Sequence, residues 1–251
     1  MVRVEKYLPN LMTFGNLFSG FYGIIICFSG DLVTGAFMIF LGAGFDVLDG
    51  MMARLVKSSS AIGKELDSLA DVVTFGLLPA TIVHILLLHS HQNWLFEYGF
   101  RGYPIISFLP FLIVAAAAYR LAKFNVDTTQ SKTFLGLPSP ANGIFFASLP
   151  LIMMNDTFLL NSNPVYLSDL ITNGWLLIGL TLILSWLMVS NIRLFSFKLK
   201  SFKFSDSKIV YIFLALDILL FIFLRWAAIP VIIFLYIILS LINKSNIHDK
   251  V

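Results

Sequence analysis

The sequence predicts an all-α integral membrane protein with about eight transmembrane helices, formed as one domain over residues 1–251. Of the 251 residues, 58% are hydrophobic and only 12% are charged, whereas soluble domains carry about 25% charged residues. Apolar runs near the ~20 residues that a bilayer-crossing helix needs recur along the chain. The basic residues also gather in alternate connecting segments. These three observations exclude a soluble enzyme.

The eight predicted spans follow one another with short connections. The first is preceded by "MVRVEKYLPN", which has basic residues but no small-residue cleavage site, so we expect a retained end and not a signal peptide. The fifth is the shortest, and Pro138, Pro140 and Pro150 lie in or beside it. In chain order the spans are 11–28, 32–54, 64–88, 104–124, 140–154, 171–190, 208–224 and 227–243.

The charges predict the orientation of the chain. With a cytoplasmic N-terminus, all of the 17 Lys and Arg residues except Arg101 and Arg225 fall on inner segments. Cytoplasmic segments are enriched in basic residues, so both termini are predicted to be cytoplasmic, in the cytoplasmic membrane of a prokaryote. The inner segment 191–208, "NIRLFSFKLKSFKFSDSK", alternates basic and aromatic residues, which favours contact with anionic headgroups.

Four aspartates lie where spans two and three approach each other. Carboxylates in a membrane segment are costly unless something compensates them. Asp46 and Asp49 are three residues apart and Asp67 and Asp71 are four apart, so each pair shares one face of its helix. Because a short inner turn joins the two helices, both faces can meet at the cytoplasmic ends of spans two and three. Four converging carboxylates would repel one another, and they suit a hard divalent cation, with room for two ions.

The structural alternative is that these acids only pair with basic residues at helix ends: Arg54, Lys57 and Lys64. Two facing pairs of acids favour the cation site over this alternative. Small residues make the second span thin beside the acids, which fits close helix packing or room for a ligand: Gly42, Gly44, Gly50 and Ala53. Arg54 is placed either to balance carboxylate charge or to hold a phosphate.

The acids form part of a longer pattern, D-x-x-D-G-x-x-A-R-x8-G-x-x-x-D-x-x-x-D, which runs from Asp46 to Asp71. It resembles the signature of the CDP-alcohol phosphotransferase family at every fixed position. The resemblance implies a membrane enzyme that transfers a phosphatidyl or similar group from a CDP-linked donor to an alcohol and releases CMP. It implies Mg2+ or Mn2+, as two ions, on Asp46, Asp49, Asp67 and Asp71, with Asp71 also acting as the catalytic base.

Further stretches resemble the phosphatidylserine synthase branch of that family: "YLPNLMTFGNLFSGF" (7–21), "GKELDSLADVVTFGLLPA" (63–80), "YRLAKFNV" (119–126) and "FLGLPSPAN" (134–142). The family core would be residues 1–205, followed by additional transmembrane helices in 206–251. Met51, Met52, Lys123 and "RLFSFK" depart from the commoner residues of the branch. These departures concern the acceptor and leave the reaction type unchanged.

The branch implies CDP-diacylglycerol and L-serine as substrates, membrane lipids as surroundings, a homodimer and no nucleic-acid partner. The residues implied for CDP and diphosphate binding are Asn10, Thr13, Gly50, Ala53, Arg54, Gly63 and Lys64. Those implied for acceptor or phosphate binding are Arg120, Lys123 and Ser139. Three alternatives stay open: glycerol 3-phosphate or inositol phosphate as acceptor, an archaeal ether-lipid donor, and a cation transporter.

Asp217 lies in the middle of the seventh span, where a carboxylate is functional by default. The family's chemistry does not require it, so we expect it to form an interhelical or dimer-contact hydrogen bond.

Overall fold

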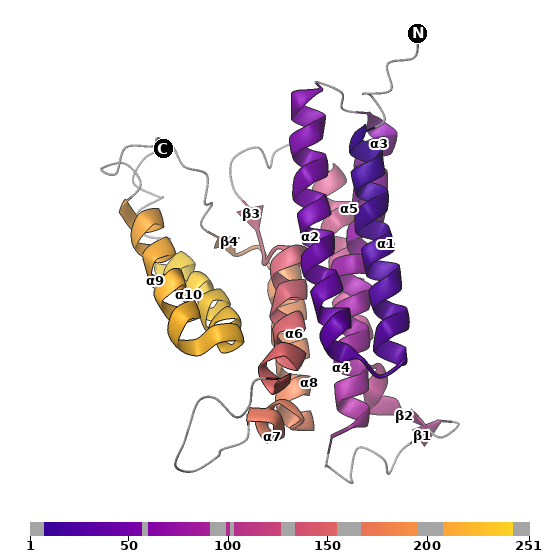
Figure 1. Cartoon of the computed structure of the whole chain (residues 1–251), viewed down its shortest axis with the longest axis vertical. Coiled ribbons are helices and arrows are strands. Elements are labelled where there is room, and N and C mark those ends of the chain that lie inside the picture. Colours follow the sequence, from indigo (N-terminus) through magenta and orange to yellow (C-terminus); the bar gives the residue numbers. More distant parts are fainter. Residues whose placement is uncertain are drawn as a thin grey trace.

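The computed structural model describes residues 8–56, 60–90, 99–100, 103–126, 134–154, 167–194 and 208–242. Within them the chain is helical apart from two pairings of two-residue strands, as predicted (Figure 1). The α-helices are α1 (Leu8–Phe28), α2 (Leu32–Leu55), α3 (Ala61–Asp71), α4 (Leu78–Leu88), α5 (Phe111–Val126), α6 (Ser139–Met154), α7 (Leu167–Ile171), α8 (Gly174–Val189), α9 (Lys208–Leu224) and α10 (Ala228–Ile242). The short elements are the π-helix η2 (Val72–Leu77), the 3-10 helices η4 (Ile105–Phe108) and η7 (Arg225–Ala227), and the strands β1 (Gly99–Phe100), β2 (Tyr103–Pro104), β3 (Phe134–Leu135) and β4 (Arg193–Leu194).

Five helical stretches in the described part of the chain are long and apolar enough to cross a membrane: 8–28, 32–55, 61–88, 105–126 and 213–241. The last stretch contains α9, η7 and α10 together. Two shorter apolar helices, α6 and α8, lie where the fifth and sixth spans are predicted. An integral membrane protein is therefore supported, while the count of eight spans stays a prediction.

The first two helices form a tight antiparallel pair. Gly30 joins them with φ of 98°, a conformation that glycine adopts without steric cost. Asp31 then begins α2, because its carboxylate accepts a hydrogen bond from the Thr34 N–H at 2.9 Å. This turn fixes the register of the pair and brings the N-terminal end of α1 and the C-terminal end of α2, which carries Asp46 and Asp49, to the same end of the bundle (Figure 1).

A continuous helix formed by α3, η2 and α4 is the centre of the fold. Most of its side chains from Ala70 to Leu88 are buried, and Phe75, Leu78 and Ile82 have no exposed area. In η2 the Leu78 N–H bonds to the carbonyl of Val73, five residues back, which marks the π-helix. Helices α1, α5 and α6 all contact this segment. A π-helix of this kind inside an α-helix frequently marks a functional site.

The strand pair β3–β4 closes the bundle beside α5. Phe134 pairs with Leu194 and Leu135 pairs with Arg193, so the segment before α6 is fixed to the segment after α8. Gly136 follows with φ of 71°, and carbonyl oxygens crowd the place where a side chain would begin. Only glycine fits this turn without strain.

Helices α9 and α10 form a hairpin at the edge of the bundle (Figure 1). Helix α10 contacts α6 and β4. At the hairpin's turn, the ring of Trp226 lies 5.7 Å from Phe37 and 6.0 Å from Phe40 of α2, measured between centroids. These aromatic contacts attach the hairpin to the rest of the fold.

Two predictions concern Asp217 and the basic residues that set the orientation of the chain. The Oδ1 atom of Asp217 is buried and has no hydrogen-bond partner among them, so that oxygen does not form the predicted interhelical bond. Most of the basic-aromatic segment 191–208 and many of the basic residues that predict the orientation lie outside the described ranges. The orientation therefore stays a prediction.

Candidate active site

Three of the four aspartates come together at one end of α2 and α3. Asp46 and Asp49 project from the last turns of α2, and Asp67 projects from α3. One carboxylate oxygen from each of the three lies within 4.8 Å of the other two. The two helical faces therefore meet, as the spacing of the acids predicts.

The residues present fit a hard divalent cation. The three ligand atoms are all carboxylate oxygens, which suit Mg2+ or Mn2+. The Oδ1 atom of Asp67 is buried and has no hydrogen-bond partner among the described residues. A buried charged oxygen without a partner is costly, and a cation would compensate both this atom and the repulsion between the three carboxylates.

Asp71 lies one helical turn beyond Asp67 and does not belong to this group of three. Only 7% of it is exposed. Its Oδ1 accepts a hydrogen bond from the side-chain amide of Asn16 in α1 at 3.0 Å. The predicted four-carboxylate site thus divides into a group of three and a separately held fourth carboxylate. Asp71 as a fourth metal ligand stays a prediction.

Asn16 is a residue that sequence reasoning missed. Thr13 and Asn16 are three residues apart and both buried, so they form a polar stripe along one face of an otherwise apolar helix. That stripe was the available signal. The hydroxyl of Thr13 donates to Asp49 Oδ2 at 2.9 Å and lies 3.1 Å from the carbonyl oxygen of Pro9. Thr13, expected to contact cytidine or diphosphate, therefore holds one of the three clustered acids.

The remaining residues implied for the CDP pocket surround the acids. A Cβ atom at Gly50 would meet nothing within 4 Å, so there is open space beside Asp49. A Cβ atom at Gly63 would lie 3.1 Å from Asn10 Oδ1, which places Asn10 against the start of α3. Ala53 is half-buried and Arg54 is exposed on the last turn of α2.

Lys64 has a structural partner in α5. Its ammonium donates to the carbonyl of Asn125 at 3.1 Å, while the Asn125 amide donates to Ser68 Oγ at 2.9 Å. These bonds tie the end of α5 to the helix that carries Asp67 and Asp71. Asn125 is a second residue that sequence reasoning missed, because its partners lie about sixty positions away in the chain.

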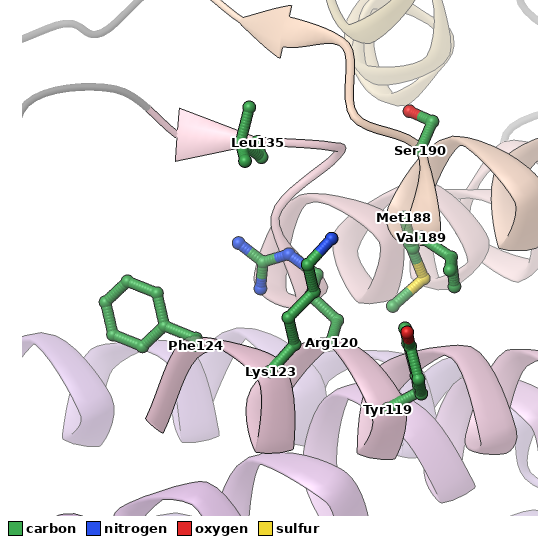
Figure 2. Close-up of a pocket in the computed structure, with 8 residues that line it drawn as sticks. All are labelled: Tyr119, Arg120, Lys123, Phe124, Leu135, Met188, Val189 and Ser190. Atoms are coloured by element: carbon green, nitrogen blue, oxygen red, sulfur yellow. The ribbon is translucent and has the colours of Figure 1, made fainter. Parts of the chain in front are cut away.

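The predicted acceptor residues lie around one pocket (Figure 2). Arg120 and Lys123 line it. Ser139 is bonded to one of these lining residues, because Arg120 Nη1 donates to Ser139 Oγ at 3.0 Å. Lys123 donates to Asn191 Oδ1 at 2.8 Å. The Nε–H of Arg120 is buried without a hydrogen-bond partner among the described residues. The pocket is lined by Tyr119, Arg120, Lys123, Phe124, Leu135, Met188, Val189 and Ser190.

Comparison with known families decides the kind of protein to which this site belongs. Residues 6–192 match the sequence model of the CDP-alcohol phosphatidyltransferase family. The chain belongs to this family. The match includes every aspartate of the site and ends before α9 and α10, so the C-terminal hairpin lies outside the matched region.

Several members of the family are similar to this chain. The CDP-diacylglycerol–serine O-phosphatidyltransferase of Bacillus subtilis is 33% identical over 77% of this chain and 92% of its own length. The protein of the same name from Helicobacter pylori J99 is 32% identical over 97% of this chain and 93% of its own length. The archaetidylserine synthase of Methanothermobacter thermautotrophicus is 33% identical over 56% of each chain.

Proposed function

We propose that this CDP-alcohol phosphatidyltransferase transfers the phosphatidyl group of CDP-diacylglycerol to the hydroxyl of L-serine, giving phosphatidylserine and CMP. The observation that carries the proposal is the similarity to a serine O-phosphatidyltransferase over 97% of the chain. The convergent carboxylates of Asp46, Asp49 and Asp67 supply the chemical setting that such a reaction requires.

The group of three aspartates would hold Mg2+ or Mn2+ beside the open space at Gly50. A bound cation offsets the charge of a diphosphate and stabilises the charge that develops on the CMP leaving group. A second ion, with Asp71 among its ligands, belongs to the same proposal. Asn10, Ala53, Gly63 and the basic groups of Arg54 and Lys64 would border the cytidine and diphosphate.

The reaction exchanges one phosphorus–oxygen bond for another. The serine hydroxyl oxygen attacks the phosphorus that bears diacylglycerol, the bond from this phosphorus to the oxygen of CMP breaks, and CMP leaves. Asp71 would take the hydroxyl proton. Its separate position, held by Asn16 and outside the group of three acids, supports this role.

That pocket suits an acceptor with a carboxylate. The buried Nε–H of Arg120 is a charged donor that lacks a protein partner among the described residues, and a carboxylate is a strong acceptor for a guanidinium. Lys123 adds a second positive charge, although Asn191 already accepts one of its hydrogen bonds. Acceptors that carry a phosphate would call for more basic groups than these two.

We place the site at the cytoplasmic face of the membrane and propose a homodimer, on the charge distribution and the family resemblance. The cation-transporter alternative is set aside because the chain belongs to a family of phosphatidyltransferases.

An acceptor-competition assay tests the proposal. The purified protein receives CDP-diacylglycerol, Mg2+ or Mn2+, and labelled L-serine, glycerol 3-phosphate or inositol phosphate in turn, with a CDP-linked archaeal ether lipid as a second donor. We expect label from serine to enter lipid with release of an equal amount of CMP. Incorporation of a phosphate-bearing acceptor without serine would make the acceptor assignment wrong.

A further inference from the structure

The polar junction between α1, α2 and η2 is not explained by substrate or metal binding alone. Asn16 at its centre has no exposed area, yet its amide N–H reaches Asp71 Oδ1 at 3.0 Å. Its backbone carbonyl accepts a hydrogen bond from Thr74 Oγ at 2.9 Å. One residue of α1 is thus bonded to both Asp71 and Thr74, three residues apart on the central helix.

The junction leaves Asn16 little freedom to move. A Cβ atom at Gly42 would lie 2.9 Å from Asn16 Oδ1, so α2 approaches this side chain closely. A Cβ atom at Gly20, one turn further along α1, would likewise lie 2.5 Å from the hydroxyl oxygen of Thr74. Two glycines therefore allow α1 and α2 to close around Asn16 and Thr74.

The hydrogen bond also restricts the Asp71 side chain. Because the Asn16 amide donates to Oδ1, it limits rotation of the carboxylate about its Cβ–Cγ bond. Asp71 is the fourth acid of the pattern and stands apart from the group of three. The π-helix η2 begins at the next residue, Val72, so the backbone on the other side of Asp71 is locally irregular and needs to be held.

We propose that Asn16 is a positioning residue for Asp71: its side-chain amide orients the carboxylate that receives the acceptor's proton, while the Thr74 hydroxyl holds the Asn16 backbone carbonyl. The inference rests on the proposed function, because it concerns the rate of the same transfer. Hydrogen bonds that orient a functional carboxylate are typically worth 10–100-fold in activity. Asn16 acts through Asp71 and is not assigned a contact with either substrate.

The test compares Asn16→Ala with a matched control, Ser19→Ala. Ser19 is equally buried and lies three residues further along α1, but its hydroxyl donates to the Gly15 carbonyl in its own helix. For Asn16→Ala we expect kcat for CMP release to fall about 10–100-fold, with KM for CDP-diacylglycerol within about twofold of wild type. Ser19→Ala should keep kcat within about twofold.

Two more variants keep the test decisive if Asn16→Ala does not fold. Thr74→Val removes the hydroxyl that anchors Asn16, and Thr74→Ser keeps it. We expect a several-fold loss of kcat for the first and recovery of most of it in the second, with thermal unfolding in detergent showing that each protein is folded.

Three results would overturn the inference: near-normal kcat in Asn16→Ala, an equal loss in Ser19→Ala, or an unchanged kcat in Asn16→Ala with a higher KM for CDP-diacylglycerol. CMP release is followed with whichever acceptor the wild-type protein uses. A wild-type protein that releases no CMP contradicts the proposed function, whereas an active wild type with an equally active Asn16→Ala variant contradicts only the role of Asn16.

Discussion

At the scale of single residues, α1 contributes more to the acidic site than its apolar sequence indicates. Thr13 bonds to Asp49 and Asn16 bonds to Asp71, so each acidic pair of the pattern has one member held by α1. Fixed partners of this kind orient functional carboxylates and reduce their freedom. The first helix is therefore part of the site.

Replacing Thr13 tests this contribution at the group of three aspartates. Thr13→Val keeps the shape of the side chain but removes the donor to Asp49, so we expect the half-maximal Mg2+ concentration for CMP release to rise about 10-fold, as for other partners of metal ligands. Thr13→Ser restores a donor and should return the value to near that of wild type. An unchanged Mg2+ requirement in Thr13→Val would show that the bond is dispensable.

The sequence predicted the meeting of Asp46, Asp49 and Asp67 because helical spacing alone places them on facing surfaces. It did not predict the partners of these acids. Asn16 and Asn125 act on residues about 55 to 60 positions away, and such pairs depend on tertiary packing that no local pattern encodes. The nucleotide contact that the family resemblance implies for Thr13 stays a prediction, and its bond to Asp49 was not predicted.

At the scale of helices, glycines determine how closely α1, α2 and the central helix approach. The small residues of α2 were predicted to serve close packing or to leave room for a ligand, and the structure shows close packing at one of them. Gly42 is packed against Thr74 and Asn16, whereas Gly44 and Gly50 face open space. The π-helix η2 was not predicted, because "VVTFGL" reads as a continuation of the same apolar helix.

Gly20→Ala tests the close packing of α1 against η2. An added methyl group would meet Thr74 Oγ at 2.5 Å and the Thr74 Cα at 2.9 Å, and backbone cannot yield as a side chain does. We expect a loss of about 1–3 kcal/mol in stability, measured as a lower melting temperature in detergent. Gly44→Ala is the control, since nothing lies within 4 Å and alanine favours a helix, so its melting temperature should stay the same or rise. Equal melting temperatures for the two variants would contradict this packing.

At the scale of the whole molecule, the family core and the C-terminal hairpin are joined through few aromatic contacts. The matched region ends at residue 192, and the hairpin is attached by Trp226 on α2 and by α10 on α6 and β4. The hairpin's helices were predicted from hydropathy. Its docking surface was not, because each of its faces is apolar and periodicity therefore distinguishes none of them.

Trp226→Ala is expected to loosen this attachment without altering the metal site. Loss of a half-buried indole that packs on the rings of Phe37, Phe40 and Phe221 should cost about 2–3 kcal/mol, somewhat less than for a fully buried tryptophan. The melting temperature should fall while the half-maximal Mg2+ concentration for CMP release stays within about twofold of wild type. Trp186→Ala, which removes a tryptophan that is 64% exposed, should lower the melting temperature less. A higher Mg2+ requirement in Trp226→Ala would show that the hairpin shapes the acidic site.

The central claim is that the carboxylates at the ends of α2 and α3 hold the divalent cation that drives phosphatidyl transfer. The most direct measurement is CMP release from CDP-diacylglycerol by purified protein after treatment with a chelator, followed by addition of Mg2+ or Mn2+. The account predicts no release until the cation is restored. It also predicts that Asp49→Asn and Asp67→Asn, although folded, lose activity about 100-fold or more at any cation concentration. Release at the full rate in the presence of the chelator, or by either variant, would contradict the account.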